Sequence, residues 1–190
     1  MSERLSFGDE QPLHEEAVQL RAPEHLPGQL GIPDDVGVVE GSPNGGARRP
    51  VGIVVARFNG DVTTRMLERA IDELAELGIP AQLVTVMPVP GAFELPLAAM
   101  ALAKTRRFAA IVALGCVIRG ETPHFQFISS EAASGLQLAA LETGVPVSFG
   151  VLTVENAEQA EARIDKAAEA VRSALEMADA FAQLRVSAAG

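Results

Sequence analysis

Between residues 51 and 182, four short apolar runs alternate with segments of helical periodicity. The runs have the length of strands and are rich in β-branched residues, which is typical of strands buried on both faces of a parallel sheet. Strands that alternate with helices pair in parallel through right-handed crossovers. The sequence therefore predicts an α/β fold, a three-layer α/β/α sandwich around a four-stranded parallel sheet. The predicted strands are residues 51–58, 81–87, 108–118 and 145–154.

The segments between the strands carry helix patterns and helix end signals. In residues 61–77, apolar side chains recur at helical spacing, and Gly78 provides a stop. Further helices are predicted over residues 93–105, 123–144 and 156–182. We expect the last of these to consist of two helices with a joint near Ile164 and Asp165.

The composition changes near residue 37. Residues 1–36 hold four scattered prolines and no sustained periodicity, so we expect a disordered N-terminal tail. That tail either only adds solubility or docks on a partner. Residues 42–50 read as a turn or linker, and residues 37–190 are expected to form one domain.

Charge and cysteine content exclude several classes of function. The chain has 15 Lys and Arg against 25 Asp and Glu, a net charge of −10, whereas a protein that binds nucleic acid needs a basic face. The single cysteine, Cys116, excludes an intrachain disulfide and suits a reducing cytosol, so we expect a cytoplasmic protein. No apolar stretch is long enough to span a bilayer, and no membrane partner is expected.

Ligands of open parallel sheets bind beyond the carboxyl ends of the strands, so the residues after each strand are the candidate site. Phe58 and Asn59 follow the first strand, and residues 89–94 follow the second. Thr153 and Glu155 come at the end of the fourth. The third strand ends in the sequence LGCVIRGETPHF, residues 114–125.

The turn after the third strand has the features of an anion site. Thr122 is predicted to cap the next helix, with Pro123 in the first helical position, where no N–H is needed. The amides of Gly120, Glu121 and Thr122 would then point out of a helix N-terminus, which attracts phosphate. His124 would lie in the first turn, where the helix dipole favours a neutral imidazole that can accept a proton. From the residues alone, His124 either transfers protons or merely packs beside the cap.

Phenylalanine is the only large aromatic residue, because the chain has no Trp and no Tyr. Phe58, Phe93 and Phe149 are predicted near strand exits, where two or three of them would form a slot for a flat ring. An aromatic residue at a strand end is more often a core residue, so Phe58 either packs in the core or stacks on a ligand ring. One histidine cannot build a metal site, and no other spacing of ligands suggests one, so no metal ion is expected.

Six motifs occur in the order and spacing of one enzyme family. They are ARFN, VPGAFELPLAA, ALGCVIRGETPHF, LETGVPVSFGVLT, EQAEAR and ALEMA. On these motifs the chain resembles the 6,7-dimethyl-8-ribityllumazine synthases (lumazine synthases) of riboflavin biosynthesis, over about residues 38–182. The VVEG sequence at residues 38–41 is similar to the family's first edge strand. The resemblance implies a flavodoxin-like fold and no metal or organic cofactor.

The resemblance also implies a reaction. Members of this family condense 5-amino-6-(D-ribitylamino)uracil with 3,4-dihydroxy-2-butanone 4-phosphate, which gives 6,7-dimethyl-8-ribityllumazine, phosphate and water. Such a reaction needs a surface for a flat heterocycle, a pocket for phosphate, and a group that transfers protons.

Roles follow from the resemblance position by position. Phe58 matches the aromatic residue that stacks on the pyrimidine ring. The segment that lines the ribityl pocket, in which the glutamate bonds hydroxyl groups, is matched by Ala92, Phe93 and Glu94. The positions whose backbone meets the pyrimidine edge are matched by Val117 and Ile118.

The remaining matches concern phosphate and proton transfer. The turn on the phosphate side is matched by Gly120, Glu121 and Thr122. His124 matches the proton-transfer histidine, and Phe149 matches a phenylalanine that the neighbouring subunit supplies. Arg163 matches the arginine that pairs with the substrate phosphate, for which a guanidinium fork is suited.

Three departures from the family pattern concern this site. Ala92 stands where many members have Ser, and Glu121 stands where Ala is common. After Arg163, the chain is shorter than the Gly-rich, Lys-containing loop of many members. Lys166 therefore either takes the place of the second loop lysine or is a solvated helix lysine.

The resemblance implies a homopentamer with active sites between subunits. Some members assemble twelve pentamers into a sixty-subunit shell, and the sequence leaves that step open, together with a partnership with riboflavin synthase. Two other readings remain at this point. One is a non-catalytic relative that binds lumazine or flavin or forms a shell. The other is an unrelated flavodoxin-like phosphosugar binder.

Overall fold

The computed structural model describes residues 30–45 and 49–187. The chain divides between Gly37 and Val38 into two units. The described part of the first unit, residues 30–37, is exposed and contains only turns and coil. Most of the tail predicted over residues 1–36 lies outside the described residues. Within the described ranges, no helix is both long and apolar enough to cross a membrane.

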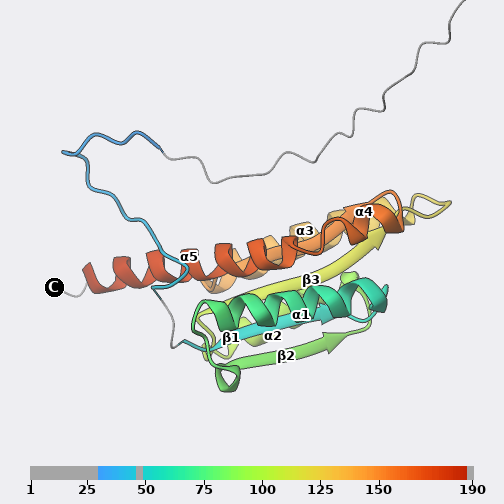
Figure 1. Cartoon of the computed structure of the whole chain (residues 1–190), viewed down its shortest axis with the longest axis horizontal. Coiled ribbons are helices and arrows are strands. Elements are labelled where there is room, and N and C mark those ends of the chain that lie inside the picture. The colour runs from blue at the N-terminus through green and yellow to red at the C-terminus, as the bar shows by residue number, and fades with distance from the viewer. Residues whose placement is uncertain (1–29, 46–48, 188–190) are drawn as a thin grey trace, which may run out of the picture. The chain divides into compact units, whose positions relative to one another are not determined.

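The second unit is built on a four-stranded sheet in which all neighbouring strands are parallel (Figure 1). The strand order is β2-β1-β3-β4, so β1 and β3 are central and β2 and β4 are the edges. The predicted α/β fold with a four-stranded parallel sheet is confirmed. The strands are β1 (Val51–Ala56), β2 (Val84–Val89), β3 (Ala110–Ile118) and β4 (Val147–Val154).

Helices connect successive strands and cover both faces of the sheet. In Figure 1, α1 lies in front of the strands and α2 lies behind them. The predicted joint near Ile164 and Asp165 is present, because it separates the last two helices. The helices are α1 (Gly60–Glu76), α2 (Leu95–Lys104), α3 (His124–Thr143), α4 (Ala157–Glu161) and α5 (Lys166–Ser187), with the short 3-10 turns η1 (Ala81–Leu83) and η2 (Ala92–Glu94).

Successive residues of each strand point to opposite faces of the sheet, and this alternation gives two cores. We call them the α1/α5 face and the α2/α3 face. In β1, Ile53 and Val55 belong to the first core, whereas Val54 and Ala56 belong to the second. On the α1/α5 face the helices contribute Met66, Leu74, Val171 and Leu175. On the α2/α3 face they contribute Leu95, Ala99, Leu136 and Ala139.

Several predicted strand boundaries were wrong. The second strand ends at Val89 and not at residue 87, and the third and fourth begin at Ala110 and Val147, two residues later than predicted. Hydrogen bonds explain two further differences. The second strand begins at Val84 and not at residue 81, because residues 81–83 form a 3-10 turn in which the Leu83 amide donates to the Pro80 carbonyl at 2.9 Å. The first strand ends at Ala56, two residues early. The Phe58 amide instead donates to the Pro90 carbonyl at 3.1 Å, within the turn that leads to α1.

The VVEG segment at residues 38–41 forms no strand in this chain. It leads instead into a stretch held against α5. The side-chain amide of Gln183 donates to the Glu40 carbonyl at 2.8 Å, and the Ser42 amide donates to Asp179 Oδ2 at 3.1 Å. These bonds hold residues 40–42 against α5, and residues 38–41 pair with neither edge strand of the described sheet.

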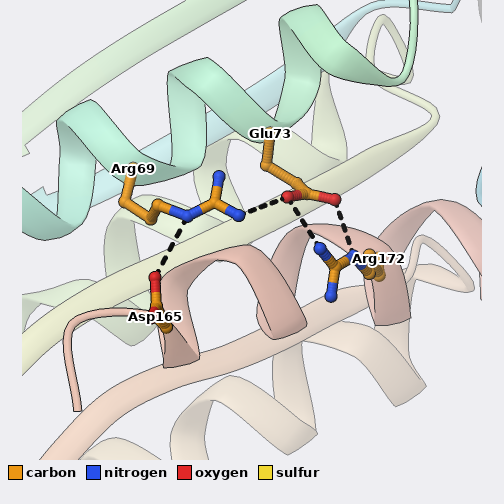
Figure 2. A network of polar contacts seen from close by, with 4 residues as sticks. All are labelled: Arg69, Glu73, Asp165 and Arg172. Atoms are coloured by element: carbon orange, nitrogen blue, oxygen red, sulfur yellow. Dashed lines mark hydrogen bonds and ion pairs between the residues drawn. The ribbon is translucent and has the colours of Figure 1, made fainter.

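A buried carboxylate joins α1 to α5 (Figure 2). Glu73 is only 2% exposed, and it accepts from Arg172 Nε at 2.6 Å and from Arg172 Nη2 at 2.9 Å. Arg69 Nη2 donates to the same carboxylate at 2.8 Å, and Arg69 Nε reaches Asp165 at 3.2 Å. Two guanidinium groups therefore compensate the one buried charge, as such a charge requires.

Candidate active site

A cleft opens at the carboxyl edge of the sheet because the strands end at different heights. The β1–β3 ladder stops at the pair Val55–Leu114, whereas the β3–β4 ladder continues to the pair Ile118–Val154. The last residues of β3 therefore have a strand on one side only. On the open side lies a cleft with a volume of about 720 Å³.

Residues from four successive segments line this cleft. They come from the turn after β1, from η2, from the end of β3 and from the start of α3, as expected for a parallel sheet. Nine of the predicted site residues are among them: Phe58, Ala92, Phe93, Glu94, Val117, Ile118, Gly120, Thr122 and His124.

Four phenylalanines line the cleft, and three of them are exposed. Phe58 is 70% exposed, Phe93 is 55% exposed and Phe127 is 67% exposed, and all three line the cleft. Phe58 is therefore not a core residue. Exposed rings at a concave site offer stacking surface to a flat ligand.

Glu94 lines the cleft and also holds the turn before it by a hydrogen bond. Its Oε2 accepts from the Gly91 amide at 2.9 Å, and this bond closes the turn that carries Ala92 and Phe93. Glu94 is half-buried. A carboxylate fixed in this way can accept hydrogen bonds from hydroxyl groups of a ligand.

The turn after β3 differs in one detail from the prediction. The helix α3 begins at His124, with Pro123 in the cap position, and no side chain caps it. The predicted cap by Thr122 was wrong, since Pro123 itself adopts helical angles and its carbonyl accepts from the Gln126 amide at 2.9 Å. His124 is exposed in the first turn and lines the cleft.

Arg119 adds a cation close to this turn. Its Nε pairs with Glu155 at 2.5 Å, and its guanidinium carbon lies 4.7 Å from the centre of the Phe125 ring. The pair joins the ends of β3 and β4. The guanidinium group of Arg119, which precedes Gly120 in the chain, thus shares its charge with Glu155.

Cys116 lies in the floor of the cleft. The residue is 2% exposed, and burial, followed by the charge of Glu161, raises the pKa of its thiol to about 11. The thiol is thus protonated at neutral pH and is no candidate nucleophile. Among the described residues, no group of three His, Cys, Asp or Glu side chains is placed to hold a metal ion.

Comparisons with known proteins agree with this geometry. A sequence model of the 6,7-dimethyl-8-ribityllumazine synthase family matches residues 49–182. The chain belongs to this family. It is 46% identical over 138 residues to the 6,7-dimethyl-8-ribityllumazine synthase of Syntrophus aciditrophicus (strain SB). This match covers 70% of the chain and 90% of the relative.

A second relative gives the same result. The chain is 46% identical over 143 residues to "6,7-dimethyl-8-ribityllumazine synthase 1" of Caulobacter vibrioides (strain ATCC 19089 / CIP 103742 / CB 15). This match covers 73% of the chain and 94% of the relative. The lumazine synthase resemblance seen in the six motifs is therefore confirmed.

Four predicted site residues do not line the cleft of the single chain: Glu121, Phe149, Arg163 and Lys166. Phe149 is 47% exposed and lies within β4, not at a strand exit as predicted. Arg163 Nη1 donates to the Gln159 carbonyl at 2.9 Å. Lys166 Nζ contacts both carboxylate oxygens of Glu169, at 2.9 and 2.7 Å.

Several residues of the cleft had been given no role of their own. Gly91, Phe125, Phe127 and Ile128 line it, together with Asn59 and Cys116. Asn59, Gly91, Cys116 and Phe125 lie in the segments predicted to form the site, whereas Phe127 and Ile128 lie outside them. No sequence signal distinguished the cleft side of α3, since Phe127 and Ile128 fit a helix pattern equally well in the core.

Proposed function

We propose that this chain catalyses the condensation of 5-amino-6-(D-ribitylamino)uracil with 3,4-dihydroxy-2-butanone 4-phosphate to 6,7-dimethyl-8-ribityllumazine, in riboflavin biosynthesis. The observation that carries the proposal is that nine residues matched to this family's site line one cleft. The same cleft has an aromatic wall, a carboxylate and a histidine, which are the kinds of group the reaction needs.

The pyrimidine lies between Phe58 and the end of β3 in this proposal. The ring of Phe58 stacks on the heterocycle, and the backbone at Val117 and Ile118 bonds its polar edge. The ribityl chain runs toward η2, where Glu94 accepts hydrogen bonds from its hydroxyl groups. The absence of a hydroxyl at Ala92 leaves these contacts to the carboxylate and the backbone.

The reacting ends meet near α3. The amine attacks the ketone, phosphate leaves, and ring closure with loss of water completes the product. His124 is the proton-transfer group, since it lies on the cleft at the first turn of α3. Phosphate binds at the turn of Gly120, Glu121 and Thr122, with Arg163 as its principal cation and Lys166 as a helper.

The site needs a second copy of the chain. Phe149 and Arg163 belong to the site in the family pattern, yet neither lines the cleft of one chain. Phe149 is half-exposed on the edge strand β4, where a neighbour can use it. A second groove of about 260 Å³ beside this strand, lined by Leu141, Val147 and Met177 among others, offers further apolar contact area.

The assembly follows from this arrangement. Each copy offers its own cleft to one neighbour and its edge strand to another, which is a head-to-tail contact that closes into a ring. We propose a homopentamer. Assembly of pentamers into a shell and a partnership with riboflavin synthase are further steps of the same proposal, as is action in the cytoplasm.

The test is a turnover assay with both substrates. Formation of 6,7-dimethyl-8-ribityllumazine and release of phosphate, both dependent on both substrates, are expected. A protein that binds the lumazine product but does not form it would overturn the enzyme proposal in favour of a non-catalytic relative.

A further inference from the structure

Asn59, between β1 and α1, has an unusual backbone conformation for a residue other than glycine. Its φ is 57° and its ψ is 46°, in the left-handed region. Among the described residues, only Asn59 and Arg106 combine a positive φ with a side chain. Asparagine tolerates this conformation better than most residues because its short polar side chain can bond locally.

The side chain of Asn59 does not do what its position predicts. At the start of a helix, an asparagine usually accepts a bond from an amide of the first turn. Here no side-chain cap bond forms, although the Asn59 carbonyl accepts from Val62 and Thr63 at 3.0 and 3.1 Å. The amide group instead crosses to β3, where Nδ2 donates to the Cys116 carbonyl at 2.9 Å.

Cys116 lies beyond the last residue of β3 that pairs with β1, which is Leu114. On that side its carbonyl has no strand partner, and the Asn59 amide takes the place of one. A buried carbonyl needs such a donor. The bond therefore joins the turn that carries Phe58 to the open part of β3.

The geometry also fixes how this bond relates to Ile118. Backbone groups alternate along a strand, and the Arg119 amide donates to the Val154 carbonyl of β4 at 2.9 Å. Cys116 and Ile118 consequently direct their backbone groups to the opposite side, toward the cleft. Asn59 thus binds the carbonyl two residues before the backbone of Ile118.

We propose that Asn59 is a positioning residue that holds the ring of Phe58 at a fixed separation from the backbone of Ile118. The turn is fixed from both sides, since the Phe58 amide donates to the Pro90 carbonyl while Asn59 bonds Cys116. The separation sets the width of the slot for a flat heterocycle. This inference rests on the proposed function in one respect only, the identity of the heterocycle.

The substitution Asn59→Gly tests the idea cleanly, because glycine keeps the left-handed backbone and removes the amide. Loss of one such hydrogen bond should weaken binding of 6,7-dimethyl-8-ribityllumazine by about 3- to 10-fold. The KM for the pyrimidine should rise in parallel, whereas the KM for the butanone phosphate should change by less than about twofold. Asn59→Asp, which keeps the shape but loses the donor, should not rescue binding.

Arg106→Gly is the matched control. Arg106 has a φ of 58°, and its Nη1 donates to the Thr143 carbonyl at 2.7 Å, before β3 begins and thus at the end of the sheet opposite the cleft. Both glycine variants should lower the melting temperature to a similar, modest extent. Only Asn59→Gly should change the affinity for the lumazine.

A double-mutant cycle with Phe58→Ala separates positioning from direct contact with the ligand. If Asn59 acts through Phe58, Asn59→Gly should change lumazine affinity by less than about twofold when the ring is already absent. Fully additive effects would show direct contact and overturn the proposal, as would unchanged affinity in the single variant or a wild-type affinity in Asn59→Asp. Binding is measured by quenching of the lumazine's fluorescence, so the outcome stands even if wild-type turnover is absent and the proposed function fails.

Discussion

The surface of α1 differs from the α2/α3 face of the sheet in how many large apolar side chains it exposes. Across α1, Ile71 is the only large apolar side chain that is exposed. Buried Glu73 joins this helix to α5 through Arg172, and Arg69 of α1 donates to the same carboxylate (Figure 2). The α2/α3 face is different, because large apolar side chains remain exposed there: Leu97, Phe127, Leu138 and Leu141 are 75%, 67%, 52% and 73% exposed.

This difference indicates which face is complete within one chain. Contiguous exposed apolar side chains mark an interaction surface, whereas scattered ones do not. Phe127 belongs to both the apolar face and the cleft. The α1 side therefore serves the stability of the single domain. The α2/α3 face offers apolar surface for assembly and, through Phe127, part of the cleft, and α5 adds exposed Met177, Leu184 and Val186 to the available apolar surface.

The largest effect on stability is expected at Glu73, on the α1 side of the sheet. Glu73→Ala removes the acceptor of both Arg69 and Arg172, and the unfolding free energy should fall by about 2–4 kcal/mol, toward the low end because both arginines reach solvent. Unfolding by denaturant measures this loss of free energy. As a control, Glu161→Ala breaks the exposed pair with Arg65 and should cost less than about 1 kcal/mol.

Equal losses in these two variants would contradict the comparison, since Glu73 would then be an ordinary surface carboxylate. Ligand affinity should stay unchanged in Glu73→Ala where the protein is folded, because Glu73 does not line the cleft.

The next effect concerns the phosphate. Arg163→Ala removes a charge-assisted bond of about 1.5–3 kcal/mol, so kcat/KM for the butanone phosphate should fall by roughly 10- to 200-fold. Lys166→Ala should cost about tenfold or less, because its ammonium group is already paired with Glu169. Steady-state kinetics of both variants against both substrates measure which substitution lowers kcat/KM more. A more damaging Lys166→Ala would show that the shortened joint has rebuilt the pocket around the lysine.

A smaller effect is expected at the ring slot. Phe58→Ala should weaken pyrimidine or lumazine binding by about 1–2 kcal/mol through lost stacking, without loss of the fold. Titration of the product's fluorescence gives the affinity, and circular dichroism reports the fold. An unchanged affinity would show that the exposed ring of Phe58 does not contact the heterocycle.

The smallest effect is expected for the N-terminal segment. Deletion of residues 1–36 should leave activity and melting temperature nearly unchanged, because nothing in that sequence is patterned to bury a core. Thermal unfolding and turnover are compared with those of the full chain. A large loss of either would mean that the segment docks on the domain or on a neighbour.

The sequence predicted the part of the fold that depends on local pattern. Strands such as β3 and the joint between α4 and α5 follow from apolar periodicity, and the cleft follows from the rule that parallel strands present their carboxyl ends together. Short-range backbone geometry was less predictable. The 3-10 turn at residues 81–83 and the uncapped start of α3 depend on hydrogen bonds that residue type alone does not determine.

The candidate site divides in the same way. Residues next to strand ends, such as Phe58 and His124, were predicted and lie in the cleft. Arg163 was named through family resemblance only, and Phe149 was also predicted at a strand exit, but the single chain brings neither to the cleft. A contribution from another copy cannot be read from local pattern, because periodicity reports which side chains are apolar and not which copy covers them.

The central claim is that one active site is shared between two copies, and subunit complementation tests it most directly. His124→Ala disables the cleft, and Phe149→Ala disables the part that the neighbour provides. Each variant alone should be impaired. Co-assembly in equal amounts should restore up to about a quarter of the wild-type sites, because that fraction pairs an intact cleft with an intact neighbour at random. Activity equal to the mean of the two separate variants would contradict the account, since both residues would then act within one chain.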